Sequence, residues 1–215
     1  MHREEHEEHL KGVLRAAYLL QLRHGPFTEQ ELGEQVSRSE LQDALSLGYF
    51  AEQTVGGGER RYSLTLKGRS QIKVVLAGGA YDVLHLGHLA SLREAKSLGD
   101  VLVAVVATDA TVQLLKGRKP IFSEADRRAL VEGLKPVDKA ILGYEDVGFG
   151  FEQVLMDVTP DIVAFGYDQE NLEKTVREII ERRNLKIQIT TLSRFDREEY
   201  ASSSSVRQKL SEEMR

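Results

Sequence analysis

From residue 72 onward, apolar runs of strand length alternate with amphipathic segments of helical length, and this alternation limits the possible folds more than any other feature. The runs are rich in valine and isoleucine, as β-strands are. Strands are expected at 72–77, 101–107, 140–144, 161–166 and 186–192, and helices at about 88–98, 123–134, 151–158 and 172–183. Strands that alternate with helices pair in parallel. We therefore predict an α/β domain with a doubly wound, five-stranded parallel sheet of Rossmann-like type.

The first seventy residues follow a different pattern. Apolar residues recur at helical spacing over 9–22, and Thr28 with Glu31 forms a capping box that starts a second helix. A third helix is expected from Ser39 to Leu47, followed by two short strands around the glycines of FAEQTVGGGERRYSLTL. Three helices and a hairpin are the elements of a winged helix-turn-helix. Two domains are therefore expected, residues 1–70 and 71–215.

Composition excludes several kinds of chemistry. The chain has no cysteine, which excludes disulfides, thiolate nucleophiles and thiolate zinc sites. Its net charge of −5 gives no general attraction to nucleic acid or to an anionic membrane. No apolar stretch approaches the roughly twenty residues of a membrane span, and the first residues lack the apolar core of a signal peptide. We expect a cytoplasmic protein without a membrane partner.

The segment GGAYDVLHLGH, residues 78–88, follows the first strand of the α/β domain. In such sheets the ligand binds beyond the carboxyl ends of the strands, where the strand order reverses. Gly78 and Gly79 allow a close backbone approach, and the helix that follows offers amide hydrogens and a positive dipole end to a phosphate. His85 and His88, three residues apart, lie on one side of its first turn. A phosphate bound there would meet both imidazoles.

This segment resembles the HxGH signature, G-x-F-D-x-x-H-x-G-H, of the nucleotidyltransferase superfamily. Four residues match it, and Ala80 and Tyr81 stand where threonine and phenylalanine are common. The resemblance implies that His85 and His88 are catalytic. It implies nucleotide binding by Gly79, Ala80, Tyr81, Asp82 and Gly87.

Three later motifs follow in the order of the superfamily. KGRKPIFSEADRRALVEGLKPVD (116–138) is similar to the segment that supplies a lysine and an arginine to the phosphates, here Lys119 and Arg127, with Lys116 a weaker match. FGYDQ (165–169) ends the fourth strand and would place Gly166 and Asp168 across the switch point from the first. ASSSSVR (201–207) is similar to the motif that holds the triphosphate, which implies Ser202, Ser203, Ser204, Ser205 and Arg207.

Some of these residues have structural alternatives. Asp168 is also placed to cap the helix after it, and the serine run also has the composition of a linker. Arg127 has a neighbour, Arg128, and adjacent residues on a helix face different directions, so only one of the two can point into the site. Asp109, at the end of the second strand, is expected to cap the next helix and is left out of the site.

Within the superfamily, GYDQ, RKPI and LKPVDxAILG look most like the archaeal type of FAD synthetase, which implies adenylyl transfer from ATP to FMN. Glycerol-3-phosphate cytidylyltransferases share the first and last motifs, so CTP and a glycerol phosphate form the competing substrate pair. Mg²⁺ is expected with the triphosphate, because it binds mainly through substrate oxygens and water. No dedicated metal site is therefore expected.

The rival function is a DNA-binding regulator whose α/β domain only senses a nucleotide. Residues 1–70 hold nine Lys or Arg and eleven Asp or Glu, a balance of 9 − 11 = −2. DNA affinity depends on phosphate contacts, and this unit lacks a basic face apart from Arg60 and Arg61 near the hairpin tip. We therefore favour a dimerisation or docking role, with a homodimer as one form, over DNA binding.

Overall fold

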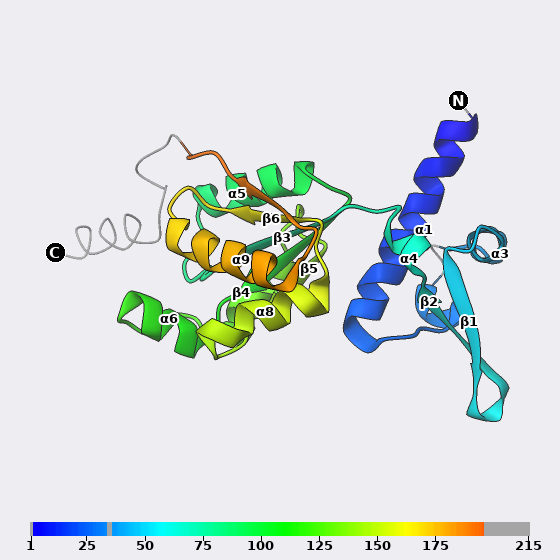
Figure 1. The fold of residues 1–215 in the computed structure, drawn as a ribbon, viewed down its shortest axis with the longest axis horizontal. Helices are drawn as coiled ribbons and strands as arrows, with labels where there is room; N and C mark the ends of the chain where they lie inside the picture. Colours follow the sequence, from blue (N-terminus) through cyan, green and yellow to red (C-terminus); the bar gives the residue numbers. More distant parts are fainter. Residues whose placement is uncertain (1, 34–35, 196–215) are drawn as a thin grey trace. The chain divides into compact units, whose positions relative to one another are not determined.

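The computed structural model describes residues 2–33 and 36–195 (Figure 1). The chain divides into two compact units, Met1–Lys73 and Val74–Arg215. No helix among the described residues has both the length and the apolar character that crossing a membrane requires.

The first unit contains the expected three helices and hairpin, followed by one more turn of helix. Thr28 and Ser37 each accept a hydrogen bond from the backbone three residues on, and Glu31 and Glu40 close the two capping boxes. Its elements are α1 (His2–His24), α2 (Glu29–Leu32), α3 (Arg38–Ser46), β1 (Phe50–Val55), the 3₁₀ turn η1 (Gly56–Gly58), β2 (Glu59–Leu64) and α4 (Leu66–Arg69).

The core of the first unit lies where α1 meets the base of the hairpin. Leu14, Phe27 and Tyr62 are almost fully buried, and the Phe27 ring packs edge-on against Phe50 with 5.6 Å between ring centroids. Outside this base, the hairpin is largely exposed on both faces.

The second unit alternates strands and helices as predicted. Its elements are β3 (Val74–Gly79), α5 (Leu86–Ser97), β4 (Val101–Val106), α6 (Asp109–Lys116), α7 (Glu124–Glu132), β5 (Lys139–Leu142), α8 (Val147–Val158), β6 (Ile162–Phe165), α9 (Glu170–Arg183) and β7 (Gln188–Thr191). The predicted α/β class and five-stranded parallel sheet are confirmed.

The strand order is β5-β4-β3-β6-β7, so the direction of winding reverses between β3 and β6. Val75, Ala77, Leu102 and Ala104 face one side of the sheet, where they pack with residues of α5 and α7 such as Leu92. Helices α8 and α9 contact each other and lie across the sheet from α5 (Figure 1). Any ligand site at the switch point is therefore formed by the segments that follow β3 and β6.

Candidate active site

His85 and His88 lie together at the beginning of α5. His85 is the N-cap residue, and its Nδ1 accepts a hydrogen bond of 3.4 Å from the His88 backbone N–H. The two rings stack, with 3.8 Å between their centroids and 27° between their planes. The expected pairing of the imidazoles is therefore confirmed, while their catalytic role stays a prediction.

The environment of His88 keeps its imidazole neutral. Burial, with smaller contributions from His85 and Lys116, lowers the pKa of His88 to about 3. Its Nδ1 is buried and has no hydrogen-bond partner among the described residues. A neutral imidazole carries one N–H, so His88 can donate one hydrogen bond to a phosphate oxygen without bringing a positive charge of its own.

The turn after β3 packs against the histidines. Tyr81 is buried with a φ of +49°, in the left-handed region, and burial raises the pKa of its hydroxyl. Its ring centroid lies 5.2 Å from that of His88, and its Cζ lies 2.9 Å from where a Cβ on Gly79 would be. The Tyr81 ring thus leaves room only for glycine at position 79, and the predicted nucleotide-binding roles of Gly79 and Tyr81 stay predictions. Gly87, which is also buried, follows in the first turn of α5.

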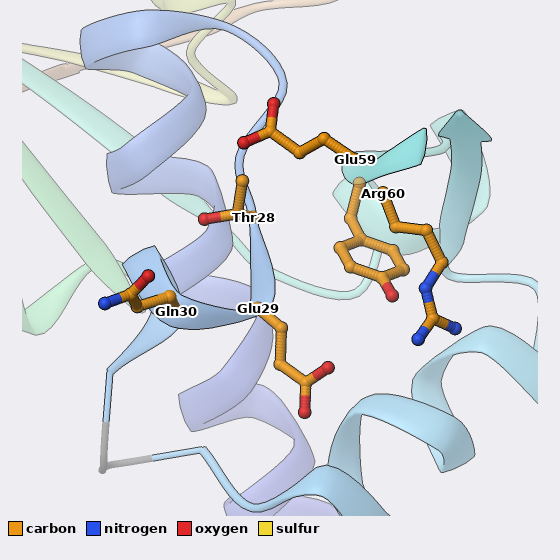
Figure 2. A pocket seen from close by; sticks show the side chains of 6 residues that line it. Thr28, Glu29, Gln30, Glu59 and Arg60 are labelled. Carbon is orange, nitrogen blue, oxygen red and sulfur yellow. The ribbon is translucent and has the colours of Figure 1, made fainter. Parts of the chain in front are cut away.

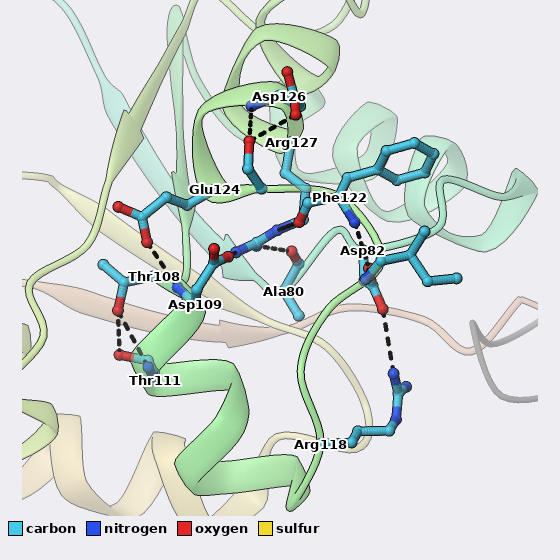
Figure 3. Close-up of polar contacts among 12 residues, drawn as sticks. Ala80, Asp82, Thr108, Asp109, Thr111, Arg118, Phe122, Glu124, Asp126 and Arg127 are labelled. Atoms are coloured by element: carbon cyan, nitrogen blue, oxygen red, sulfur yellow. Dashed lines mark hydrogen bonds and ion pairs between the residues drawn. The ribbon is translucent and has the colours of Figure 1, made fainter.

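Asp82 holds the loop between α6 and α7. Its carboxylate, 2% exposed, accepts hydrogen bonds from the backbone N–H of Ile121 at 2.5 Å and of Phe122 at 3.5 Å. It also accepts from Arg118 Nη1 at 3.2 Å (Figure 3). We call this group of contacts the Asp82 clasp. In this structure the Asp82 carboxylate anchors loop 117–122, and its nucleotide-binding role stays a prediction.

Arg127 makes a second set of links in the same region (Figure 3). Its side chain has no exposed surface, and its guanidinium donates to the carbonyl oxygens of Ala80 and Phe122 and to Asp109 Oδ1, the last at 2.7 Å. The buried guanidinium is thus held by protein groups, and its expected contact with the reacting phosphates stays a prediction. Of the two adjacent arginines Arg127 does point inward, as a link between three segments of the site.

The lysines of the KGRK segment lie at the outside of this framework. Lys116 ends α6, Gly117 takes the left-handed conformation with a φ of +64° after it, and Lys119 is exposed in the clasped loop. Lys119 therefore has a solvent-accessible side chain on a loop whose later residues, Ile121 and Phe122, are held by Asp82. An accessible ammonium group of this kind can contact a phosphate.

The segment after β6 meets β3 across the switch point. Gln169 bridges the two strand ends: its Oε1 accepts from the Gly166 N–H at 2.7 Å, and its Nε2 donates to the Gly78 carbonyl oxygen at 3.0 Å. Asp168 is exposed, and its Oδ1 lies 3.1 Å from where a Cβ on Gly166 would be. Helix α9 begins at Glu170 with Gln169 as its N-cap, so the alternative that Asp168 caps this helix is wrong.

The predicted triphosphate-binding residues Ser202–Ser205 and Arg207 lie outside the described residues. Sequence reasoning missed three residues that shape the site: Gln169, Arg118 and Asp109. Asp109 is the first residue of α6, whereas Thr108 is its N-cap, so the expectation that Asp109 caps the helix is wrong. The sequence does indicate two of them by their position: Asp109 and Gln169 both follow the carboxyl end of a strand that lies next to β3.

A separate hollow of about 250 Å³ lies in the first unit (Figure 2). It is lined by residues from the start of α2 and from β2: Thr28, Glu29, Gln30, Glu59, Arg60 and Tyr62. None of the predicted site residues lines it.

Comparison with known proteins identifies the second unit. Residues 76–209 match the model of the family described as cytidylyltransferase-like, and this range is more than half of the chain. The chain belongs to the cytidylyltransferase-like family. The predicted superfamily and the nucleotidyltransferase reaction class are thereby confirmed.

Several of the similar proteins are archaeal FAD synthases. A FAD synthase of Aciduliprofundum boonei is 47% identical over 121 residues, which is 56% of this chain and 78% of that protein. A FAD synthase of Thermoplasma acidophilum is 44% identical over 138 residues, which is 64% of this chain and 94% of that protein. A crystal structure described as a lipopolysaccharide core biosynthesis protein, from Thermoplasma volcanium, is 42% identical, with a TM-score of 0.54 over 58% of this chain and 99% of its own.

Proposed function

We propose that this protein is an FMN adenylyltransferase, which joins AMP from ATP to FMN and releases pyrophosphate. The observation that carries the proposal is the stacked pair His85 and His88 at the switch point. That pair lies in a chain whose relatives at 44–47% identity are FAD synthases. The helix start, the two imidazoles and the exposed Lys119 together suit a bound triphosphate.

The reaction needs positioning and charge rather than a protein nucleophile. A phosphate oxygen of FMN attacks the α-phosphorus of ATP in line, the bond from the α-phosphorus to the bridging oxygen breaks, and pyrophosphate leaves with the electron pair. His85 and His88 donate hydrogen bonds to phosphate oxygens as charge grows on them, and Lys119 neutralises that charge. Asp82 and Arg127 keep the loop of Lys119 in place.

Magnesium is the cation that we propose to accompany ATP. Within residues 2–33 and 36–195, no cluster of three His, Asp or Glu side chains could hold a metal ion. Mg²⁺ keeps most of its waters and binds mainly through phosphate oxygens, so ATP itself would supply its ligands.

For the first unit we propose a winged helix-turn-helix that serves in dimerisation or docking rather than in DNA binding. Three helices precede its hairpin. Arginines that would face a duplex have glutamate partners: Arg61 Nε lies 2.9 Å from Glu59, and Arg60 and Arg38 each lie 4.0 Å from a glutamate. Paired in this way, they offer little charge to DNA phosphates.

The test uses the full chain with Mg²⁺, either ATP or CTP, and either FMN or glycerol 3-phosphate, and measures pyrophosphate. We expect release with ATP and FMN only, and none from His88→Ala. Release with CTP and glycerol 3-phosphate instead would replace the proposed function by cytidylyl transfer. Salt-sensitive binding of duplex DNA without turnover would favour the regulator.

A further inference from the structure

Several of the large apolar side chains that the second unit exposes lie near the ligand end of its sheet, while others, such as Leu114, Leu115 and Met156, lie on helices. Leu86 and Tyr167 follow the carboxyl ends of β3 and β6, and Ile121 and Phe122 lie in the loop tied to the turn after β3 by the Asp82 clasp. Ile121 is 58% exposed and Phe122 is 42% exposed. Apolar surface gathered beside a charged site indicates a ligand with an apolar part.

The backbone beneath Ile121 and Phe122 is held more firmly than that of an ordinary surface loop. Asp82, 2% exposed, accepts from both of their N–H groups, and Arg127, fully buried, donates to the Phe122 carbonyl oxygen at 3.1 Å. Two buried charged side chains therefore fix a dipeptide whose own side chains are left in solvent. The Phe122 ring points away from these polar contacts (Figure 3).

The nucleotide competes for this surface only through its aromatic base. Its phosphates need amides and cations, which the start of α5 and the KGRK segment provide. A polyol phosphate such as glycerol 3-phosphate offers nothing apolar to a phenylalanine ring. An acceptor that carries a phosphate at one end and a flat aromatic ring system at the other accounts for both Lys119 and the apolar pair two and three residues beyond it.

We infer that Ile121 and Phe122 form the platform on which the ring system of the acceptor binds, so that they determine acceptor specificity. This inference rests on the proposed function, since it places the isoalloxazine ring of FMN against these two side chains. The two side chains would then select a flavin phosphate over a small phosphate ester. Asp82 and Arg127 are then positioning residues for the platform as well as for the loop of Lys119.

The experiment compares Phe122→Ala and Phe122→Tyr with Leu130→Ala in the full chain. Leu130 is 48% exposed on α7 and is none of the residues proposed for the site, so it is the matched control. Binding of FMN is followed by its own fluorescence anisotropy, and KM is measured for FMN and for ATP. Thermal unfolding of each variant checks that it folds.

We expect Phe122→Ala to bind FMN about tenfold more weakly, as for the loss of one ring contact, with the KM for ATP within about twofold of wild type. Phe122→Tyr keeps the ring and should restore the affinity, and Leu130→Ala should match wild type. If wild type is active on FMN and folded Phe122→Ala binds FMN as tightly as wild type, the platform inference is overturned and the proposed function stands. A change in oligomeric mass with unchanged FMN affinity would overturn it too, in favour of a contact between copies.

Failure of the proposed function looks different. In that case wild type itself turns over no flavin with any triphosphate, and both proposals fall together.

Discussion

At the scale of single residues, the pKa of His88 is shifted far from the ordinary value of a histidine. Its imidazole is largely buried beside Tyr81 and His85, with Nδ1 unpartnered among the described residues, and its pKa is lowered to about 3. An ordinary histidine in an unfolded chain titrates near 6.5. The free energy of unfolding is therefore linked to pH through this residue.

Below pH 6.5 the unfolded chain protonates this imidazole and the folded chain does not, so stability falls as the pH falls. From pH 6.5 to 5 we expect His88 to account for a loss of about 1–2 kcal/mol. Urea unfolding of the second unit at several pH values should show a flatter dependence for His88→Leu than for wild type. Equal slopes in the two proteins would contradict the lowered pKa of His88.

Asp82 gives a second test at this scale. Asp82→Asn keeps an oxygen acceptor for the loop N–H groups but loses the charge that faces Arg118. We expect the unfolding free energy to fall by about 1–3 kcal/mol, kcat to fall with KM for ATP little changed, and trypsin to cut the KGRK segment faster.

The control for Asp82 is Asp126→Asn, which alters an exposed carboxylate bonded to Ser123 Oγ on neighbouring α7. This variant should leave both the cleavage rate and kcat unchanged. Equal effects of the two substitutions would mean that the clasp has no special role in catalysis.

At the scale of elements, the close contact between α4 and the residue before β1 is the most sterically demanding in the first unit. A Cβ on Gly68 would lie 2.2 Å from the Tyr49 carbonyl oxygen, which is backbone and cannot swing aside. Gly68→Ala should therefore cost about 1–3 kcal/mol or more in the unfolding of this unit.

The control for Gly68 is Gly12→Ala on α1, where nothing lies within 4 Å of the new methyl group. This change should stabilise the helix by about 0.5–1 kcal/mol, because alanine restricts the unfolded chain. Melting curves of the two variants should therefore move in opposite directions. A shift in the same direction would refute the steric argument.

Elements were predictable from sequence where burial sets the pattern. Strand β4 is buried along its whole length and reads as an unbroken apolar run, so it was found within one residue. A helix is expected after Asp109, but its bounds do not follow from the sequence, because Leu114 and Leu115 of α6 face solvent and the segment is short. Helix α5 begins two residues earlier than expected because His85 caps it.

The site was predictable to a lesser degree. The position of His85 and His88 follows from a strand end and a three-residue spacing, both of which are local. Asp82 and Arg127 carry the charges expected of substrate-binding residues. In the structure both side chains form hydrogen bonds with backbone groups, which lie up to 47 residues away in the sequence. Only the tertiary structure shows where such a side chain points.

At the scale of the whole molecule, the first unit is an addition to the catalytic unit. The Thermoplasma volcanium structure matches 58% of this chain over 99% of its own length, so a protein of that extent folds without such an addition. We expect residues 74–215 alone to fold and to keep kcat and the KM values within a few-fold of the full chain. Circular dichroism and pyrophosphate release measure this. An insoluble or inactive fragment would show that the first unit completes the enzyme.

The bridge made by Gln169 also bears on how the protein reaches its native state. It joins the ends of β3 and β6 across 91 residues of chain, and the links of Asp82 and Arg127 close further loops of 39 and 47 residues. Contacts so distant along the chain form slowly, because the loops between them must lose their entropy first. The pairing of β3 with β6 spans a similar stretch of chain, because Val75 lies opposite Ile162. The Gln169 bridge therefore forms together with that pairing, and a newly synthesised chain has to complete β6 before the switch point exists.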